Sequence, residues 1–204
     1  MNFYYWVGYH LSWLAGRFLF RLRVIHPERM IQSGPVILAM NHQSYLDPPL
    51  AGITCDRPIY FFARRTLLDV PLLGRVLPKV NVIPVNQEGV DRSAIKAVIR
   101  VLQAGNGVLL FPEGSRTIDG NLQPAEPGLG LIIAKTLAPV VPMRIFGARE
   151  ALPRGSRRLR LVPITIVVGE PIFFSADDLG PQGRNLYAAL SDRVMKAISA
   201  LRLE

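Results

Sequence analysis

Residues 35–47 read PVILAMNHQSYLD, an apolar run that passes directly into a polar one. The apolar part, PVILAM at 35–40, has the length and composition of a buried strand. Five similar runs bounded by turn residues follow it: IYFFA (59–63), VNVIPV (80–85), GVLLFP (107–112), VVPMRIF (140–146) and LRLVPITIVV (159–168). Pro163, inside the last run, indicates a bulge or an edge position. Together the runs predict the strands of one sheet.

Helical periods separate the apolar runs. One helix is predicted from a cap at Asp91 to about Gly105, with an apolar face formed by Ile95, Val98, Ile99 and Leu102. Two more are predicted at about 128–138 and at 185–203. Strands that alternate with helices predict a single α/β domain with a mostly parallel or mixed central sheet flanked by helices. In such sheets the functional residues gather in the turns that follow the strands.

The composition limits the class of protein. The chain has 204 residues, half of them hydrophobic, and a formal net charge of +9. This length suits one domain with its own core. The positive charge suits anionic lipid, nucleic acid or an acidic carrier protein as a partner. The single cysteine, Cys55, excludes an internal disulfide and multi-cysteine metal clusters, and the sequence contains neither metal-ligand spacing nor a dinucleotide fingerprint.

Aromatic residues are concentrated at the N-terminus. Eight of the 17 in the chain, including both tryptophans, lie in the first 20 positions: Phe3, Tyr4, Tyr5, Trp6, Tyr9, Trp13, Phe18 and Phe20. Residues 2–16 carry no charged side chain, and three arginines follow by position 23. The run is shorter than the roughly 20 apolar residues that span a membrane. It also lacks the leading positive charge of a signal peptide.

Two interpretations of this segment are open. Tyr and Trp favour the headgroup level of a membrane, and arginines bind lipid phosphates. Residues 1–30 are therefore predicted to form a membrane-associating helical segment that lies in the interface. The alternative is an ordinary core helix, because Ser12 and Gly16 interrupt the amphipathic pattern.

The polar run after PVILAM contains a candidate catalytic pair. His42 stands at the end of the predicted strand, and Asp47 follows five residues later. A histidine takes a proton from an attacking hydroxyl near neutral pH, and a carboxylate fixes its tautomer and stabilises the imidazolium. Pro48 and Pro49 favour a sharp change of chain direction. Alone, the pair is equally consistent with a histidine that caps a helix.

A second polar run, FPEGSRT at 111–117, follows the predicted strand GVLLF. A turn of this kind exposes backbone N–H groups, as at many anion and oxyanion sites. Arg116 adds a bidentate donor that suits phosphate. The alternative is a plain turn with a solvated arginine.

The two runs together resemble the glycerolipid acyltransferase family, whose best-known activity is 1-acylglycerol-3-phosphate acylation. Members carry four blocks, and this sequence has all four in the same order: Asn41 to Asp47, Phe62 to Leu77, Phe111 to Arg116, and Val140 to Met143. The resemblance covers about residues 35–170. It implies an acyltransferase domain over 31–204 after the N-terminal segment 1–30.

The resemblance also implies roles for single residues. His42 is the general base for the acceptor hydroxyl and Asp47 its orienting partner, with direct attack on the thioester and no acyl-enzyme. The Gly114 N–H is a candidate oxyanion donor, and Glu113 positions acceptor or loop. The substrate-binding residues implied are Asn41, Arg64, Ser115 and Arg116, of which the two arginines bind phosphate.

The implied reaction needs no cofactor and no metal. Its partners are acyl-CoA or acyl-carrier protein as donor and a membrane lysophospholipid as acceptor, and its place is the cytoplasmic face of a membrane, the inner membrane if the source is bacterial. The acceptor is expected to be 1-acylglycerol 3-phosphate. Another lysophospholipid or a lyso-aminolipid is the alternative, because residues 122–128 read LQPAEPG where the family often has Phe-Lys-x-Gly.

Three other interpretations concern the basic stretch, a protein without activity, and nucleic-acid binding. The basic stretch Arg149 to Arg160 suits anionic lipid, an acidic carrier protein or a solvated face. A catalytically silent lipid-binding protein would not need the full set of motif residues. Nucleic-acid binding would account for the charge but not for the aromatic N-terminus.

Overall fold

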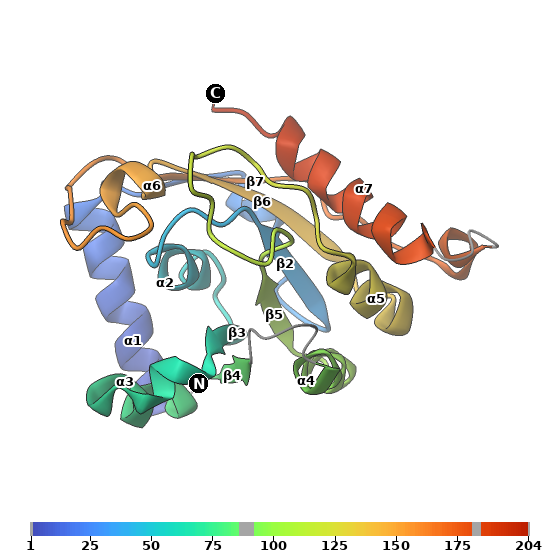
Figure 1. Ribbon diagram of the computed structural model, residues 1–204, viewed down its shortest axis with the longest axis horizontal. Coiled ribbons are helices and arrows are strands. Elements are labelled where there is room, and N and C mark those ends of the chain that lie inside the picture. The colour runs from blue at the N-terminus through green and yellow to red at the C-terminus, as the bar shows by residue number, and fades with distance from the viewer. Residues whose placement is uncertain (1, 86–91, 181–184, 204) are drawn as a thin grey trace.

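A seven-stranded sheet in the order β1-β7-β6-β2-β5-β3-β4 forms the centre of the computed structural model (Figure 1). Residues 2–85, 92–180 and 185–203 are described, without the side chains of Arg64, Leu72 and Leu73. The strands are β1 (Arg23–Ile25), β2 (Val36–Met40), β3 (Ile59–Arg64), β4 (Val82–Val85), β5 (Gly107–Leu110), β6 (Val140–Phe146) and β7 (Thr165–Val168). Neighbouring strands run parallel except β6 and β7. The predicted α/β fold with a mostly parallel sheet is confirmed.

Each predicted apolar run contains a strand, with two differences. The last strand covers only Thr165–Val168, because Pro163 has no N–H for a sheet and the residues before it lie at the surface. β1 was not predicted, since it has three residues and none of them is fully buried. It is held by pairing with β7, where Arg23 lies opposite Thr165.

Helices cover both faces of the sheet. α1 (Phe3–Leu14), α2 (Asp47–Gly52) and α6 (Ala148–Ala151) lie on one side (Figure 1). On the other side lie α4 (Arg92–Gln103), α5 (Pro127–Thr136) and α7 (Leu186–Ala200), which correspond to the three predicted helices. The predicted cap at Asp91 falls outside the described residues. A further short helix, α3 (Pro71–Val76), lies beside the N-terminal end of α1 in Figure 1.

The central strand β2 explains why PVILAM is apolar throughout. Its alternate side chains Val36, Leu38 and Met40 pack in one core with Leu50 and Ala51 of α2. The side chains between them, Ile37 and Ala39, pack in the core formed with α4, α5 and α7. Every residue of β2 is fully buried, so the strand has no solvated face, which is typical of a parallel sheet covered on both sides.

The predicted N-terminal helix is confirmed as α1, which continues as a π-helical segment at Ala15–Leu19. Its inner face is fixed to the domain: the Tyr5 hydroxyl accepts a hydrogen bond from the Ile59 N–H at 3.0 Å, and Gly16 packs against Leu50 of α2 and Ile53, which follows that helix. Large apolar side chains are exposed along the rest of the segment: Phe3, Tyr4, Trp6, Leu11, Trp13, Leu14, Phe18 and Leu19. Within the described ranges, every helix is too short or too polar to cross a membrane.

Replacing Tyr5 with phenylalanine is expected to lower the free energy of unfolding by about 1–3 kcal/mol, because it leaves the buried Ile59 N–H without an acceptor. Denaturant unfolding would measure the loss. Tyr4→Phe is the matched control, since Tyr4 is half-exposed on the outer side of the same helix, and it is expected to change stability by less than about 0.5 kcal/mol. Equal stabilities for the two variants would contradict this account of how α1 is held.

Candidate active site

The two predicted functional runs meet at the carboxyl ends of β2 and β5. These strands are parallel neighbours, with Ala39 opposite Leu110, so the segments that leave them emerge side by side. The His42 ring stacks on the Phe111 ring, with centroids 3.8 Å apart and an interplanar angle of 13°. The Thr117 N–H donates to the His42 carbonyl at 2.9 Å. The two runs therefore form one site, as expected for an α/β sheet.

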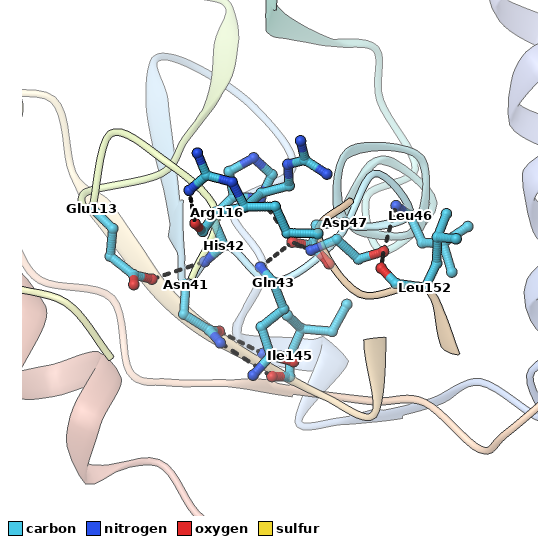
Figure 2. Close-up of polar contacts among 11 residues, drawn as sticks. Asn41, His42, Gln43, Leu46, Asp47, Glu113, Arg116, Ile145 and Leu152 are labelled. Atoms are coloured by element: carbon cyan, nitrogen blue, oxygen red, sulfur yellow. Dashed lines mark hydrogen bonds and ion pairs between the residues drawn. The ribbon is translucent and has the colours of Figure 1, made fainter. Parts of the chain in front are cut away.

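The structure brings the predicted catalytic pair together (Figure 2). The distance between His42 Nδ1 and Asp47 Oδ2 is 2.8 Å. The Asp47 carboxylate is fully buried, whereas the His42 side chain is 17% exposed. An ionised carboxylate only accepts hydrogen bonds, so Nδ1 carries the proton in this pair. The unprotonated Nε2 is then the ring nitrogen left to take a proton from a substrate.

Backbone groups hold the Asp47 carboxylate in place. Its Oδ2 atom also accepts hydrogen bonds from the N–H groups of Gln43 and Ser44, at 2.5 and 2.7 Å. The Ser44 hydroxyl donates to the Leu152 carbonyl at 2.8 Å, which fixes the turn to the segment after α6. Asp47 itself begins α2, so the local sequence NHQSYLDPP builds both the turn and the pair. The site is thus rigid before any substrate arrives.

Glu113 connects the two runs through hydrogen bonds from its carboxylate. One carboxylate oxygen accepts the His42 N–H at 2.8 Å and the other accepts the Gln123 N–H at 2.9 Å. Burial raises the pKa of the Glu113 carboxyl, and these two hydrogen bonds oppose that shift. Of the two roles implied for this residue, the geometry favours the positioning of loops, because both oxygens are already bound to backbone.

Asn41 occupies a position that sequence reasoning assigned to substrate binding. Its side chain is buried, and it exchanges two hydrogen bonds with the backbone of Ile145 in β6. These bonds extend the β2–β6 pairing past its last backbone partners, Met40 and Met143. In this arrangement Asn41 holds the end of β2 where His42 begins. Its predicted contact with substrate stays a prediction.

The Gly114 N–H, which is predicted as an oxyanion donor, has a partner within its own turn. It donates to the Phe111 carbonyl at 3.0 Å and closes a tight turn in which Gly114 has a φ of +67°. A positive φ favours glycine, so the residue is needed for the shape of the turn. The next two N–H groups, those of Ser115 and Arg116, donate to none of the described residues.

Arg116 has an unused charge close to the catalytic pair. Its guanidinium lies over the Tyr45 ring, with Cζ 3.6 Å from the ring centroid. The Nη1 atom is buried and has no hydrogen-bond partner within the described part of the chain. A buried donor without a partner is costly, so the guanidinium is available to an anionic ligand. The side chain of Arg64, the other predicted phosphate ligand, lies outside the described structure, and its backbone ends β3.

A cavity of about 920 Å³ extends from the catalytic pair into the molecule. His42, Ser115 and Arg116 line its polar end. The remainder is mainly apolar and is built by α1, α2, β3, β4 and residues 67–80, including Gly8, Tyr9, Ile53, Phe61, Leu77 and Val82. Sequence reasoning missed the contribution of α1, although Tyr5, Gly8, Tyr9 and Ser12 recur at the helical spacing that would reveal one face.

The sequence is similar to known acyltransferases. A family model described as acyltransferase matches residues 21–146. The chloroplast 1-acyl-sn-glycerol-3-phosphate acyltransferase BAT2 of Brassica napus is 31% identical over 76% of this chain and 46% of its own length. The 1-acyl-sn-glycerol-3-phosphate acyltransferase of Bacillus subtilis is 26% identical over 88% of this chain and 87% of its own. This chain thus spans about half the length of BAT2 and most of the bacterial relative.

A solved structure has the same fold. The crystal structure of the 1-acyl-sn-glycerophosphate (LPA) acyltransferase PlsC from Thermotoga maritima superposes with a TM-score of 0.78 at 22% sequence identity. The superposition covers 97% of this chain and 80% of that one. The arrangement of sheet and helices is therefore shared.

Proposed function

The chain belongs to the acyltransferase family, and we propose that it transfers a fatty acyl group from acyl-CoA or acyl-carrier protein to the free hydroxyl of 1-acylglycerol 3-phosphate, which gives phosphatidic acid. One observation carries the proposal: the His42–Asp47 pair lies at the polar end of an apolar cavity, beside the unpaired guanidinium of Arg116. The activity named for both relatives supports this acceptor.

The proposed reaction is a direct acyl transfer. His42 Nε2 takes the proton of the acceptor hydroxyl as its oxygen attacks the thioester carbonyl, and Asp47 stabilises the imidazolium that forms. The tetrahedral intermediate then collapses, the C–S bond breaks, and the imidazolium returns the proton to the leaving thiolate. The products are one ester and one thiol.

The developing oxyanion needs hydrogen-bond donors that are in place before reaction. Because the Gly114 N–H is bound to Phe111, we assign this role to the N–H groups of Ser115 and Arg116. Both residues line the cavity with His42. The turn closed by Gly114 then serves to present the next two peptide groups.

The phosphate and the acyl chain of the acceptor match the polar end and the apolar part of the cavity. A phosphate placed against Arg116 would satisfy its buried Nη1, and Arg64 is proposed as a second phosphate ligand. The apolar part of the cavity suits a long acyl chain. Another lysophospholipid or a lyso-aminolipid is the second candidate acceptor, because residues 122–128 lack the lysine expected there.

Membrane association is part of the proposal. The inner face of α1 lines the cavity, and the rest of this segment exposes aromatic and aliphatic side chains next to Arg17 and Arg21. A helix of this kind lies in the interface of a bilayer. We propose that the domain rests on the cytoplasmic face of a membrane, where thioester donors are made, with the cavity opening close to the lipid.

The test is thiol release from acyl-CoA, and separately from acyl-carrier protein, by the purified chain in neutral detergent micelles. Three acceptors separate the candidates: 1-acylglycerol 3-phosphate, 1-acylglycerophosphocholine and monoacylglycerol. Release that depends on the first acceptor supports the proposal. Release with 1-acylglycerophosphocholine alone would move the assignment to the second candidate, and no release with any acceptor and either donor would favour a lipid-binding protein without activity.

Replacing Arg116 with alanine is expected to raise the KM for 1-acylglycerol 3-phosphate by roughly 10- to 100-fold, the range that corresponds to one lost charge-assisted hydrogen bond. The KM for monoacylglycerol, which has no phosphate, should stay the same. Steady-state kinetics with both acceptors measure the difference. Arg100→Ala, an exposed arginine of α4 on the other side of the sheet, is the control. An equal change with both acceptors would remove the phosphate role.

A further inference from the structure

The connection between α6 and β7 carries an unusual surface. Residues 154–161 read RGSRRLRL, and no acidic residue occurs between positions 151 and 169. Arg154, Arg157, Arg158 and Arg160 are all exposed, and so are Leu159 and Leu161, which are 49% and 64% accessible. None of the proposed catalytic steps uses residues 157–161. We refer to these five residues as the arginine–leucine segment.

This segment is held in a fixed conformation. The Arg160 N–H donates to the Ala151 carbonyl at 2.8 Å, and Val162 packs against the core. The Arg154 side chain donates to the Arg116 carbonyl at 2.9 Å, so the connection is also attached to the loop that lines the active site. The backbone therefore holds the two leucines at the surface, whereas the next apolar residue, Val162, packs inward.

The arginine–leucine segment adjoins the C-terminal end of the N-terminal helical region. The Ile164 N–H donates to the Phe20 carbonyl at 2.9 Å and the Arg23 N–H donates to the Ile164 carbonyl at 3.0 Å, and Figure 1 shows the α6–β7 connection beside this end of α1. The neighbouring Phe18 and Leu19 are exposed as well. Apolar and basic side chains from two distant parts of the sequence are thus exposed on either side of the contact between Phe20 and Ile164.

The chemistry of this surface indicates its partner. Within the described ranges, the arginines at 17, 21, 157, 158 and 160 form no ion pair. Unpaired arginines interleaved with exposed leucines suit a layer that offers phosphate at one depth and hydrocarbon just below it. An acidic protein would pair with the arginines but would gain less from burying Leu159 and Leu161, which alternate with these charges.

From these observations we infer that the arginine–leucine segment is a second membrane-attachment element, which binds anionic phospholipid while α1 inserts its aromatic side chains. The inference rests on the proposed attachment through α1. Two attachment elements instead of one would fix the orientation of the domain on the bilayer. The acceptor then reaches Arg116 from the lipid plane.

The experiment compares binding of the full chain to two kinds of vesicle: phosphatidylcholine alone, and equal parts of phosphatidylcholine and phosphatidylglycerol. Both tryptophans, Trp6 and Trp13, lie on the exposed side of α1, so intrinsic fluorescence reports its insertion without a label. The variant Arg157→Gln/Arg158→Gln/Arg160→Gln removes three charges. The matched control, Arg92→Gln/Lys96→Gln/Arg100→Gln, removes three exposed charges from α4 on the other side of the sheet.

The triple variant of the segment is expected to bind the anionic vesicles on the order of 100-fold more weakly than the control, since each interfacial arginine contributes about a factor of five. Binding to phosphatidylcholine alone should be the same for both. Leu159→Ser/Leu161→Ser should weaken binding to both vesicles. Thiol release in neutral detergent should be retained by all variants, which separates this inference from the proposed reaction.

Two results would overturn the inference. One is equal affinity of the segment variant and the α4 control for anionic vesicles. The other is loss of transfer from acyl-carrier protein, with transfer from acyl-CoA and vesicle binding intact, which would assign the segment to the donor protein. Circular dichroism of each variant confirms that it is folded before binding is measured.

Discussion

Replacing His42 with alanine is expected to lower kcat for acyl transfer by on the order of 100- to 10,000-fold, the range for a positioned general base. The His42 Nδ1 is bound to Asp47 and only Nε2 remains to take the proton of the acceptor hydroxyl. No other histidine lines the cavity among the described residues. Thiol release from the better donor, with saturating acceptor, measures the effect.

Two controls make the result specific. His26→Asn replaces a histidine outside the cavity, in a left-handed conformation that asparagine tolerates, and should retain full activity. His42→Ala also removes the stacking on Phe111, so its thermal unfolding is compared with that of the unmodified chain. Near-normal turnover by a folded His42→Ala protein would rule out the proposed mechanism.

Replacing Asp47 with asparagine is expected to lower kcat by about 100-fold or more while the fold is retained. The amide oxygen of asparagine can still accept the N–H groups of Gln43 and Ser44. The same position, that of Oδ2, binds His42 Nδ1, so the amide oxygen also accepts the Nδ1 proton and the ring keeps its tautomer. The histidine would keep its position and the Nε2 lone pair, but lose the negative charge that stabilises the imidazolium.

The tautomer gives this prediction a readout that a loss of structure would not produce. Nitrogen NMR of the ring should show Nδ1 protonated both in the unmodified neutral protein and in Asp47→Asn. Asp56→Asn, at an exposed aspartate after α2, should change neither the tautomer nor kcat. A folded Asp47→Asn protein with unchanged turnover would remove Asp47 from the catalytic pair.

The fold was predictable for those elements whose own residues show the pattern of a strand or a helix. β2 is apolar at every position because both of its faces are covered, so its run stands out in the sequence. β1 has no such signal, since its three residues are only partly buried or exposed and depend on β7 for their hydrogen bonds. Only the end of the long run at 159–168 forms a strand, because residues 159–161 are apolar and basic but lie at the surface.

The candidate site was predictable to the extent that its chemistry is local. His42 and Asp47 are five residues apart, and the resemblance of their run to the family motif predicts the contact. The bonds that hold the pair are not local: Glu113 reaches His42 from 71 residues away, and Asn41 reaches Ile145 across 104. The hydrogen bond from the Gly114 N–H to Phe111 was not predicted either, because a sequence does not show that the turn itself takes up this donor.

The edge position of β1 separates the order of synthesis from the order of assembly. Arg23 pairs with Thr165, and a ribosome adds roughly 5–20 residues per second. The N-terminal helix and strand therefore emerge on the order of ten seconds before the strand that completes their place in the sheet exists. Early in that interval β2 also lacks both of its neighbours, since β5 and β6 follow it in the chain. The first strand to be made can join the sheet only after β7, the last.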